Sequence, residues 1–138
     1  MADVELALLV DRFMRQIHAS LQAKAADFDT ENVGPAGGML LLTLADMGRP
    51  EMHELTARFA RDKSQMTRVV RALEGKGLVV RQRSDRDQRA HVLSLSAKGH
   101  QVVAVLQQVL ADTISDLVAP LDSGDQKVLK ALLARVVP

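Results

Sequence analysis

Apolar residues recur at helical spacing in three segments near the two ends of the chain. The first segment lies within residues 1–25, the second within residues 96–120, and the third begins at Asp122 or Ser123. Because side chains three and four positions apart share one face of a helix, this spacing predicts three amphipathic helices. The apolar positions are Leu6, Leu9, Val10, Phe13, Ile17, Leu21; Val102, Val103, Leu106, Val109, Leu110, Thr113, Ile114, Leu117; and Val128, Leu129, Leu132, Leu133, Val136.

A further helix is expected after a turn at residues 29–34. Pro35 suits the first turn of this helix, which runs to Gly48. Gly37 and Gly38 weaken its start, since each glycine inside a helix costs roughly 1 kcal/mol relative to alanine. Either the helix begins later, or the backbone at these glycines closely approaches another group.

The pattern next predicts a short helix over Met52–Ala60 and a longer one from Asp62 to Lys76. Asp62 can accept from the amides of the next turn and Gln65 can reach back, which is a capping-box pattern. Gly77 ends the helix, and Leu78 can fold back onto it. The predicted inward face of the longer helix is Met66, Val69, Val70 and Leu73, and the opposite face carries Ser64, Arg68 and Arg71.

Alternating and β-branched residues predict two short strands, at residues 78–82 and 91–95, joined by a charged loop. The fold class is therefore mainly α with a small β component (α+β). Three helices followed by a hairpin make a winged helix-turn-helix domain, which we place at residues 34–96. Residues 1–33 and 97–138 form a separate helical region.

Positive charge is concentrated in one part of the chain. Residues 58–89 hold ten basic and four acidic residues, a balance of +6, whereas the remainder holds eight basic and thirteen acidic residues, a balance of −5. The small overall charge of +1 conceals this polarity. A local field of this kind favours a polyanionic partner.

Composition narrows the function classes. The chain has no Cys, Trp or Tyr and only three Phe, which excludes thiol chemistry and disfavours base stacking on aromatic residues, so duplex DNA is the better polyanion. No catalytic constellation is evident, and the glycines of residues 34–38 lack the Lys-Ser/Thr ending of a phosphate loop. We expect no enzyme activity, no cofactor and no metal site, because the four histidines lack short ligand spacing. The lack of a membrane span or a signal peptide predicts a cytoplasmic protein.

The segment Ser84–Arg89 carries the most specific motif of the chain, and Arg83 stands one position before it. This segment is similar to the D-x-R-D-x-R wing motif of the MarR family of transcriptional regulators. The other matching segments are Glu54–Phe59, Asp62–Val70, Leu73–Glu74, Lys76–Val79 and Leu93–Gly99. The resemblance is detailed over about a third of the chain, while the terminal helices match in pattern only.

The resemblance implies a homodimer held by residues 1–33 and 97–138, which would form the dimerisation region. Each protomer would place the helix of residues 62–76 in a major groove and its hairpin, the wing, on a minor groove of a pseudo-palindromic operator. It further implies a repressor that responds to a small-molecule effector. The alternative is a winged-helix module that binds protein, for which an acidic or apolar face in place of the Ser64, Arg68 and Arg71 face would be expected.

On this interpretation the helix contacts bases or nearby phosphates, and Arg68 is the residue best suited to grip a guanine. In the wing, Arg86 is assigned to the minor groove. Arg89 can contact DNA too or pair with an aspartate and stiffen the loop, since the aspartates serve to orient the arginines. Arg15 and His18 are candidates for an effector pocket, although a surface histidine is the commoner outcome. The full DNA-binding set is Lys63, Ser64, Gln65, Thr67, Arg68, Arg71, Arg81, Arg83, Arg86 and Arg89, with Asp85 and Asp87 as the orienting acids.

Overall fold

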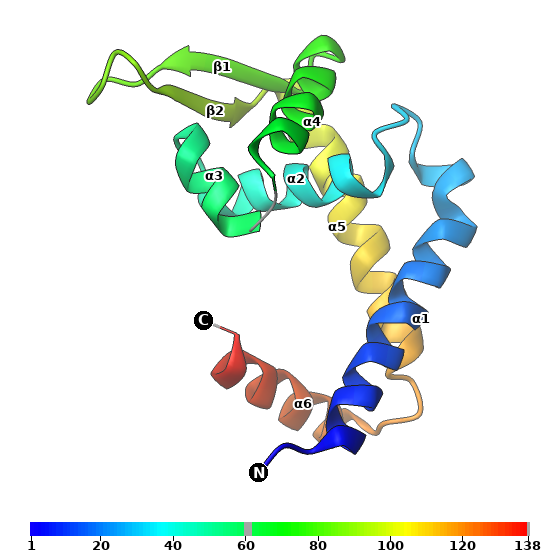
Figure 1. Cartoon of the computed structure of the whole chain (residues 1–138). Helices are drawn as coiled ribbons and strands as arrows, with labels where there is room; N and C mark the ends of the chain where they lie inside the picture. The colour runs from blue at the N-terminus through cyan, green and yellow to red at the C-terminus, as the bar shows by residue number, and fades with distance from the viewer. Residues whose placement is uncertain (60–61, 138) are drawn as a thin grey trace. The chain divides into compact units, whose positions relative to one another are not determined.

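The computed structural model describes residues 1–59 and 62–137, in which six helices and one two-stranded antiparallel sheet are present (Figure 1). The elements are α1 (Val4–Phe28), α2 (Gly34–Met47), α3 (Met52–Phe59), α4 (Lys63–Gly75), β1 (Val79–Arg83), β2 (His91–Leu95), α5 (Ala97–Leu117) and α6 (Ser123–Val136). This confirms the predicted fold class. Ala60, the expected last residue of the third helix, lies outside the described residues.

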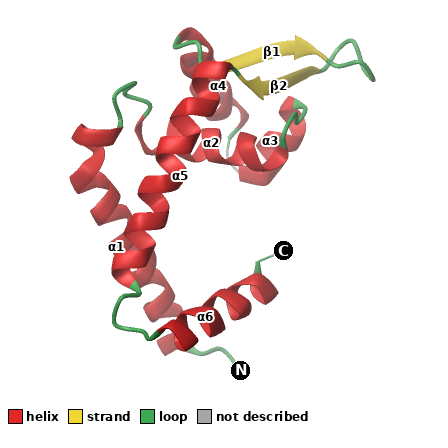
Figure 2. Cartoon of the chain, turned by 180° about the vertical axis from the view of Figure 1, so that it is seen from behind, coloured by secondary structure: helices red, strands yellow, loops and turns green. Residues whose placement is uncertain are grey.

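The chain forms two compact units: residues 26–108, and a helical unit of residues 1–25 with 109–138. The boundaries of the predicted domains remain a prediction. Within residues 26–108, β1 and β2 form a hairpin, called the wing below, whose connecting loop projects away from α2, α3 and α4 (Figure 2). Strand β1 begins at Val79, one residue later than expected, because the Leu78 amide bonds back to Leu73 O in the last turn of α4.

One apolar core holds the unit of residues 26–108 together. Its members come from α2, α3, α4, the wing and the first half of α5, and most are almost fully buried. Of the predicted inward face of α4, Met66, Val70 and Leu73 are buried, and Val69 packs half-buried against them. The core residues are Leu40, Leu41, Leu44, Leu55, Met66, Val70, Leu73, Leu78, Val79, Leu93 and Val103.

Helix α2 begins at Gly34, before Gly37 and Gly38, so the expectation that it begins later is wrong. Gly37 and Gly38 are both buried. A β-carbon on Gly37 would lie 3.0 Å from Cβ of Val33 and 3.5 Å from Cδ2 of Leu73. The tight contact is with Val33, just before α2, while Leu73 of α4 lies at ordinary van der Waals distance. This close packing explains a glycine that weakens the helix locally.

Local chemistry fixes both ends of α4. Asp62 Oδ1 accepts from the Ser64 amide at 2.9 Å, although no bond from Gln65 back to Asp62 is present in the described part of the chain, so only half of the expected capping box forms. At the other end, Gly77 has a φ of 73° and donates to Glu74 O at 2.9 Å, while the Leu78 amide donates to Leu73 O at 3.0 Å. This is a Schellman motif, and it confirms the predicted helix end.

Side chains also cap the starts of α5 and α6. Ser96 Oγ accepts from the Gly99 amide at 2.9 Å and caps α5 as predicted. Of the two candidates for α6, Asp122 is the cap, because its Oδ1 accepts from the Asp125 amide at 2.7 Å.

The helical unit has little internal core. No residue of α1 or α6 is buried, and both helices expose large apolar side chains. Thr113 on α5 is fully buried, and its Oγ1 accepts from Lys24 Nζ at 3.2 Å. Among the described helices, none has the length and apolar character that crossing a membrane requires.

Candidate nucleic-acid interface

The exposed face of α4 presents three long polar side chains. Gln65, Arg68 and Arg71 are exposed, and within the described residues none of them forms a hydrogen bond or ion pair with the rest of the chain. The Lys63 side chain at the start of the helix is also exposed and forms no hydrogen bond or ion pair within the described residues. Their donors are therefore available to an external partner.

The short polar residues of α4 are engaged internally. Ser64 Oγ donates to Asp62 Oδ1 at 2.9 Å, and Thr67, which is half-buried, donates to Lys63 O at 2.8 Å. Hydrogen bonds from the Ser64 backbone and hydroxyl, helped by the charge of Arg68, hold the pKa of Asp62 below its ordinary value. The Asp62 carboxylate thus fixes the first turn of α4 in its charged form, and both hydroxyls keep only lone pairs for a partner.

Arg81, a member of the predicted DNA-binding set, has an acidic neighbour in the structure. Its Nη2 and Nε lie 2.8 and 3.2 Å from Glu74 Oε1, and both side chains are 29% exposed. The pair joins the last turn of α4 to β1. Arg83, two residues further along the strand, is exposed and has no such partner among the described residues.

Hydrogen bonds from backbone amides to Asp87 shape the loop of the wing. Asp87 Oδ1 accepts from the Arg89 amide at 3.0 Å, and Ala90 N donates to Asp87 O at 3.0 Å. In the part of the chain that the structure describes, neither Arg86 nor Arg89 forms an ion pair with Asp85 or Asp87. The expected pairing between an aspartate and an arginine guanidinium is therefore not the arrangement seen, and both guanidinium groups are exposed.

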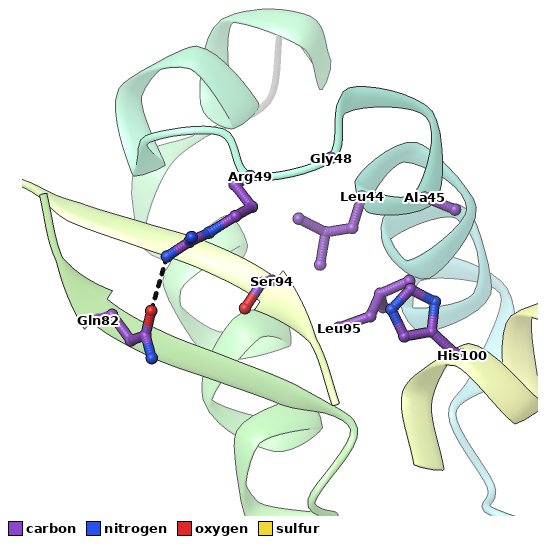
Figure 3. A pocket seen from close by; sticks show the side chains of 8 residues that line it. All are labelled: Leu44, Ala45, Gly48, Arg49, Gln82, Ser94, Leu95 and His100. Carbon is purple, nitrogen blue, oxygen red and sulfur yellow. Dashed lines mark hydrogen bonds between the residues drawn. The ribbon is translucent and has the colours of Figure 1, made fainter. Parts of the chain in front are cut away.

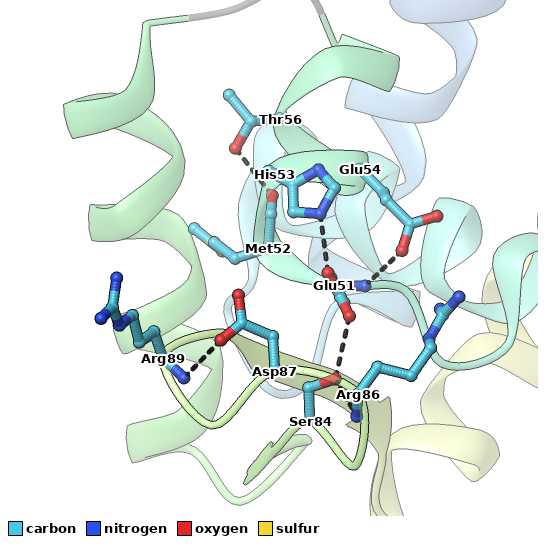
Figure 4. Close-up of polar contacts among 9 residues, drawn as sticks. All are labelled: Glu51, Met52, His53, Glu54, Thr56, Ser84, Arg86, Asp87 and Arg89. Atoms are coloured by element: carbon cyan, nitrogen blue, oxygen red, sulfur yellow. Dashed lines mark hydrogen bonds and ion pairs between the residues drawn. The ribbon is translucent and has the colours of Figure 1, made fainter.

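Sequence reasoning missed a buried polar cluster beside the wing (Figure 4). Glu51, between α2 and α3, accepts from Ser84 Oγ at 2.9 Å through Oε1, and its Oε2 lies 2.7 Å from His53 Nε2. These hydrogen bonds from Ser84 and His53 hold the pKa of Glu51 below its ordinary value. Glu51 and Ser84 are 33 residues apart, so no local motif could have indicated the pair.

The same cluster brings ligand-type atoms of Glu51, His53 and Glu54 within 4.8 Å of one another. Each of the three residues already has a hydrogen-bonding partner, since Glu54 Oε1 accepts from the Glu51 amide at 3.1 Å. The geometry is accounted for by these bonds.

An open cavity of about 500 Å³ lies on another part of the same unit (Figure 3). Arg49 Nη2 donates to Gln82 Oε1 at 2.7 Å across one side of it, and His100 lies at the other side. A smaller cavity of about 220 Å³ is lined by Phe28, Lys98 and neighbouring residues.

The two residues proposed for an effector pocket line neither of these cavities. Arg15 is exposed and pairs with Asp11 one turn earlier in α1, with 2.8 Å between Nε and Oδ2. His18 is exposed on the same helix. Their role remains a prediction.

The winged-helix part of the chain matches a known protein family. The MarR family model matches residues 36–91, from the third residue of α2 through α3, α4 and β1 to the first residue of β2. A putative transcriptional regulatory protein for the hcr operon of Thauera aromatica is 31% identical over 121 residues, covering 88% of this chain and 73% of that protein. The chain belongs to the MarR family. It is accordingly a DNA-binding transcriptional regulator with a winged-helix fold, as the sequence resemblance indicated.

A second relative and two solved structures extend the comparison. The exopolysaccharide II synthesis transcriptional activator ExpG of Rhizobium meliloti (strain 1021) is 31% identical over 75% of this chain, which spans about half (53%) of that protein. Wild-type MarR from E. coli in its apo form has a TM-score of 0.78 at 21% identity, covering 100% of this chain and 98% of that one. A mutant MarR from E. coli complexed with operator DNA has a TM-score of 0.71 at 20% identity, covering 99% and 100%. At these identities the structures are evidence of a shared fold.

Proposed function

We propose that this MarR-family chain is a homodimeric repressor that binds a pseudo-palindromic operator and releases it when a small-molecule effector binds. One observation carries the proposal. Among the described residues, the long donors of α4 are exposed and without internal partners beside a basic wing, whereas three nearby acids are occupied: Asp62 in a helix cap, Glu74 in an ion pair and Asp87 in a turn. A surface that serves only solubility has no need of this separation.

Base recognition is assigned to α4. Arg68 can donate two parallel hydrogen bonds to a guanine, and Gln65 can pair in the same way with an adenine. Arg71 and Lys63 contact bases or phosphates nearby. Ser64 and Thr67 contribute as acceptors, because their hydroxyl protons are directed to Asp62 Oδ1 and Lys63 O.

The wing supplies the second contact. Arg86 is assigned to the minor groove and Arg83 to phosphate, and both guanidinium groups are exposed. Arg89 is placed beside them, with Asp87 shaping the loop through the Arg89 amide. Arg81 is the least favoured member of the predicted set, because contact with phosphate would compete with Glu74.

The homodimer is supported by the apolar surface of α1 and α6. Leu6, Leu9 and Val10 on α1 are 50–58% exposed, and Leu132 and Leu133 on α6 are each 49% exposed. Apolar surface on this scale needs a cover, and a second copy of the chain supplies it with two-fold symmetry. The two α4 helices of such a dimer then require half-sites about 10 bp apart, or a multiple of that.

The decisive experiment is selection of bound duplexes from a random DNA pool at physiological salt, with wild type, Arg68→Ala and Arg12→Ala in parallel. Arg12 is an exposed arginine of α1, so its variant loses the same charge outside the proposed DNA interface. We expect a symmetric enriched sequence with wild type and Arg12→Ala, and degraded enrichment with Arg68→Ala. Failure of all three to enrich any sequence would favour the protein-binding alternative.

The direction of regulation needs a separate test, since one relative is named a transcriptional activator. A reporter placed behind the selected sequence should fall in expression when the chain is supplied. A rise would contradict the repressor role and leave operator binding intact.

A further inference from the structure

Glu51 occupies the N-cap position of α3. Its carbonyl accepts from the amides of Glu54 at 3.0 Å and Leu55 at 3.1 Å, and its own amide donates to Glu54 Oε1 at 3.1 Å. That last bond is the second half of a capping box, with Glu54 reaching back from the third helical position. The first half is missing, because the Glu51 side chain does not bond to the amides of its own helix.

Glutamate is not among the residues that N-caps favour, which are Ser, Thr, Asp and Asn. A short side chain at this position would cap α3 better. The Glu51 carboxylate instead extends to the wing, where Oε1 accepts from Ser84 Oγ at 2.9 Å. The choice of residue at this N-cap is therefore explained by the wing and not by the helix.

Ser84 also forms hydrogen bonds with the loop between β1 and β2. Its Oγ accepts from the Arg86 amide at 3.2 Å, and its own amide donates to Ala90 O at 3.0 Å. The loop between β1 and β2 is thus held at its first residue by the Glu51 carboxylate, with Arg86 next in the chain of bonds (Figure 4). The Arg86 guanidinium has no ion-pair partner within the described residues and stays exposed.

The contact is shielded from water. Glu51 is 9% exposed and Ser84 5%, while Arg86 and His53 on either side are exposed. A buried carboxylate is costly unless its oxygens are bonded, and here Ser84 occupies one oxygen and His53 the other. Removal of either end leaves a buried polar group without its partner, which makes the link sensitive to substitution.

The backbone of the same linker is attached to the other strand of the wing. Pro50 O accepts from the Leu93 amide at 2.9 Å, and Glu51 forms an isolated antiparallel bridge with Val92. The linker between α2 and α3 therefore contacts the wing at β2 through its backbone and at the loop through the Glu51 side chain.

We propose that Glu51 is the positioning residue of the wing, which holds Ser84, and through it the Arg86 backbone, in the conformation that meets DNA. The DNA-binding consequence rests on the contact proposed above for Arg86. Asp87 holds the Arg89 amide from within the loop, and Glu51 adds a second brace from outside it.

The first test measures the wing without DNA. Hydrogen exchange of the Arg86 amide should accelerate by about tenfold in Glu51→Ala and in Ser84→Ala, and the double variant should match the single ones because they remove one shared contact. Glu51→Gln keeps an acceptor for Ser84 and should restore most of the protection. Glu54→Ala is the matched control, since it removes the α3 cap bond but touches neither Ser84 nor Arg86. Unchanged exchange in Glu51→Ala, or equal acceleration in Glu54→Ala, overturns the proposal.

The second test measures affinity for the selected operator in a cycle with Arg86→Ala. In the wild-type background Glu51→Ala should weaken binding about tenfold, and in the Arg86→Ala background by less than about twofold. An equal loss in both backgrounds overturns the route through Arg86. If Arg86→Ala binds as wild type, the proposed minor-groove contact is wrong, and the exchange measurement alone still decides whether Glu51 positions the wing.

Discussion

The guanidinium of Arg81 lies 2.8 Å from the carboxylate of Glu74, and this ion pair ties the last turn of α4 to the first strand of the wing. Its two side chains are equally exposed, at 29% each. The two elements assigned to DNA are thus joined by an internal charge pair. An arginine held in this pair has less freedom to follow a phosphate.

We therefore expect Arg81 and Arg83 to differ in their effect on the salt dependence of DNA binding. Each phosphate contact changes the slope of log affinity against log salt by roughly 0.9. Arg83→Ala should reduce the slope by about one contact and weaken specific and random duplexes alike, whereas Arg81→Ala should leave the slope nearly unchanged. Fluorescence anisotropy across a salt series measures both. A full one-contact change in Arg81→Ala would show that DNA displaces Glu74.

Arg68→Ala should act on specificity. If Arg68 donates two bonds to a base, its loss should cost about 1–3 kcal/mol on the selected operator and much less on random duplex. Arg68→Lys keeps the charge but not the planar fork, so it should recover affinity for random DNA without recovering the specificity ratio. A specificity ratio that stays at the wild-type value in Arg68→Ala would show that Arg68 does not contact bases.

The parts of this fold that local chemistry determines could be predicted from the sequence. Asp62 and Gly77 mark the two ends of α4 because a cap and a left-handed residue act within a turn of where they stand. The inward face of α4 followed in the same way from residue spacing. These features need no knowledge of the rest of the chain.

Contacts between distant segments could not be predicted. Glu51 and Ser84 meet only because α3 and the wing pack against a shared core, and neither residue stands out in a composition or a spacing. The same holds for Arg81, which belongs to a basic cluster by sequence and to an ion pair by packing. The place of Arg81 in the DNA-binding set therefore stays a prediction, and the ion pair with Glu74 is a feature that its sequence position could not indicate.

Gly99 is expected to be the glycine least tolerant of substitution near the wing. A β-carbon there would collide with the backbone carbonyl of Leu78, an atom that also accepts from Ser96 N and cannot move away freely. Gly99→Ala should lower the free energy of unfolding by about 1–3 kcal/mol. Gly75→Ala is the matched control, because open space surrounds Gly75 within α4 and alanine should stabilise that helix slightly. Denaturant titration of both variants tests the contrast, which an equal response would contradict.

Acid sensitivity should come in part from Glu51 and Asp62, whose pKa values are both held below ordinary by hydrogen bonds to the charged carboxylate. A carboxyl with a lowered pKa in the folded state adds stability that is complete above its unfolded pKa, roughly 4, and is lost as the pH falls through the folded value. The free energy of unfolding should therefore decrease from about pH 5 downward. In Glu51→Gln and in Asp62→Asn, which retains a good N-cap, the decrease should be shallower. Curves parallel to wild type would show that these carboxylates do not contribute.

The proposed dimer predicts a separation of folding from operator binding. Leu9 on α1 is 51% exposed and Leu132 on α6 is 49% exposed, so an aspartate at either position costs the single chain little. In a dimer the same charge would be buried against apolar side chains and left without a partner, which is strongly unfavourable. Leu9→Asp and Leu132→Asp should therefore shift the mass measured by light scattering toward the monomer and weaken operator binding steeply. Lys127→Ala, a change at an exposed charged position of α6, should do neither. A monomeric wild type, or aspartate variants that remain dimers, would contradict the assignment of α1 and α6 to the interface.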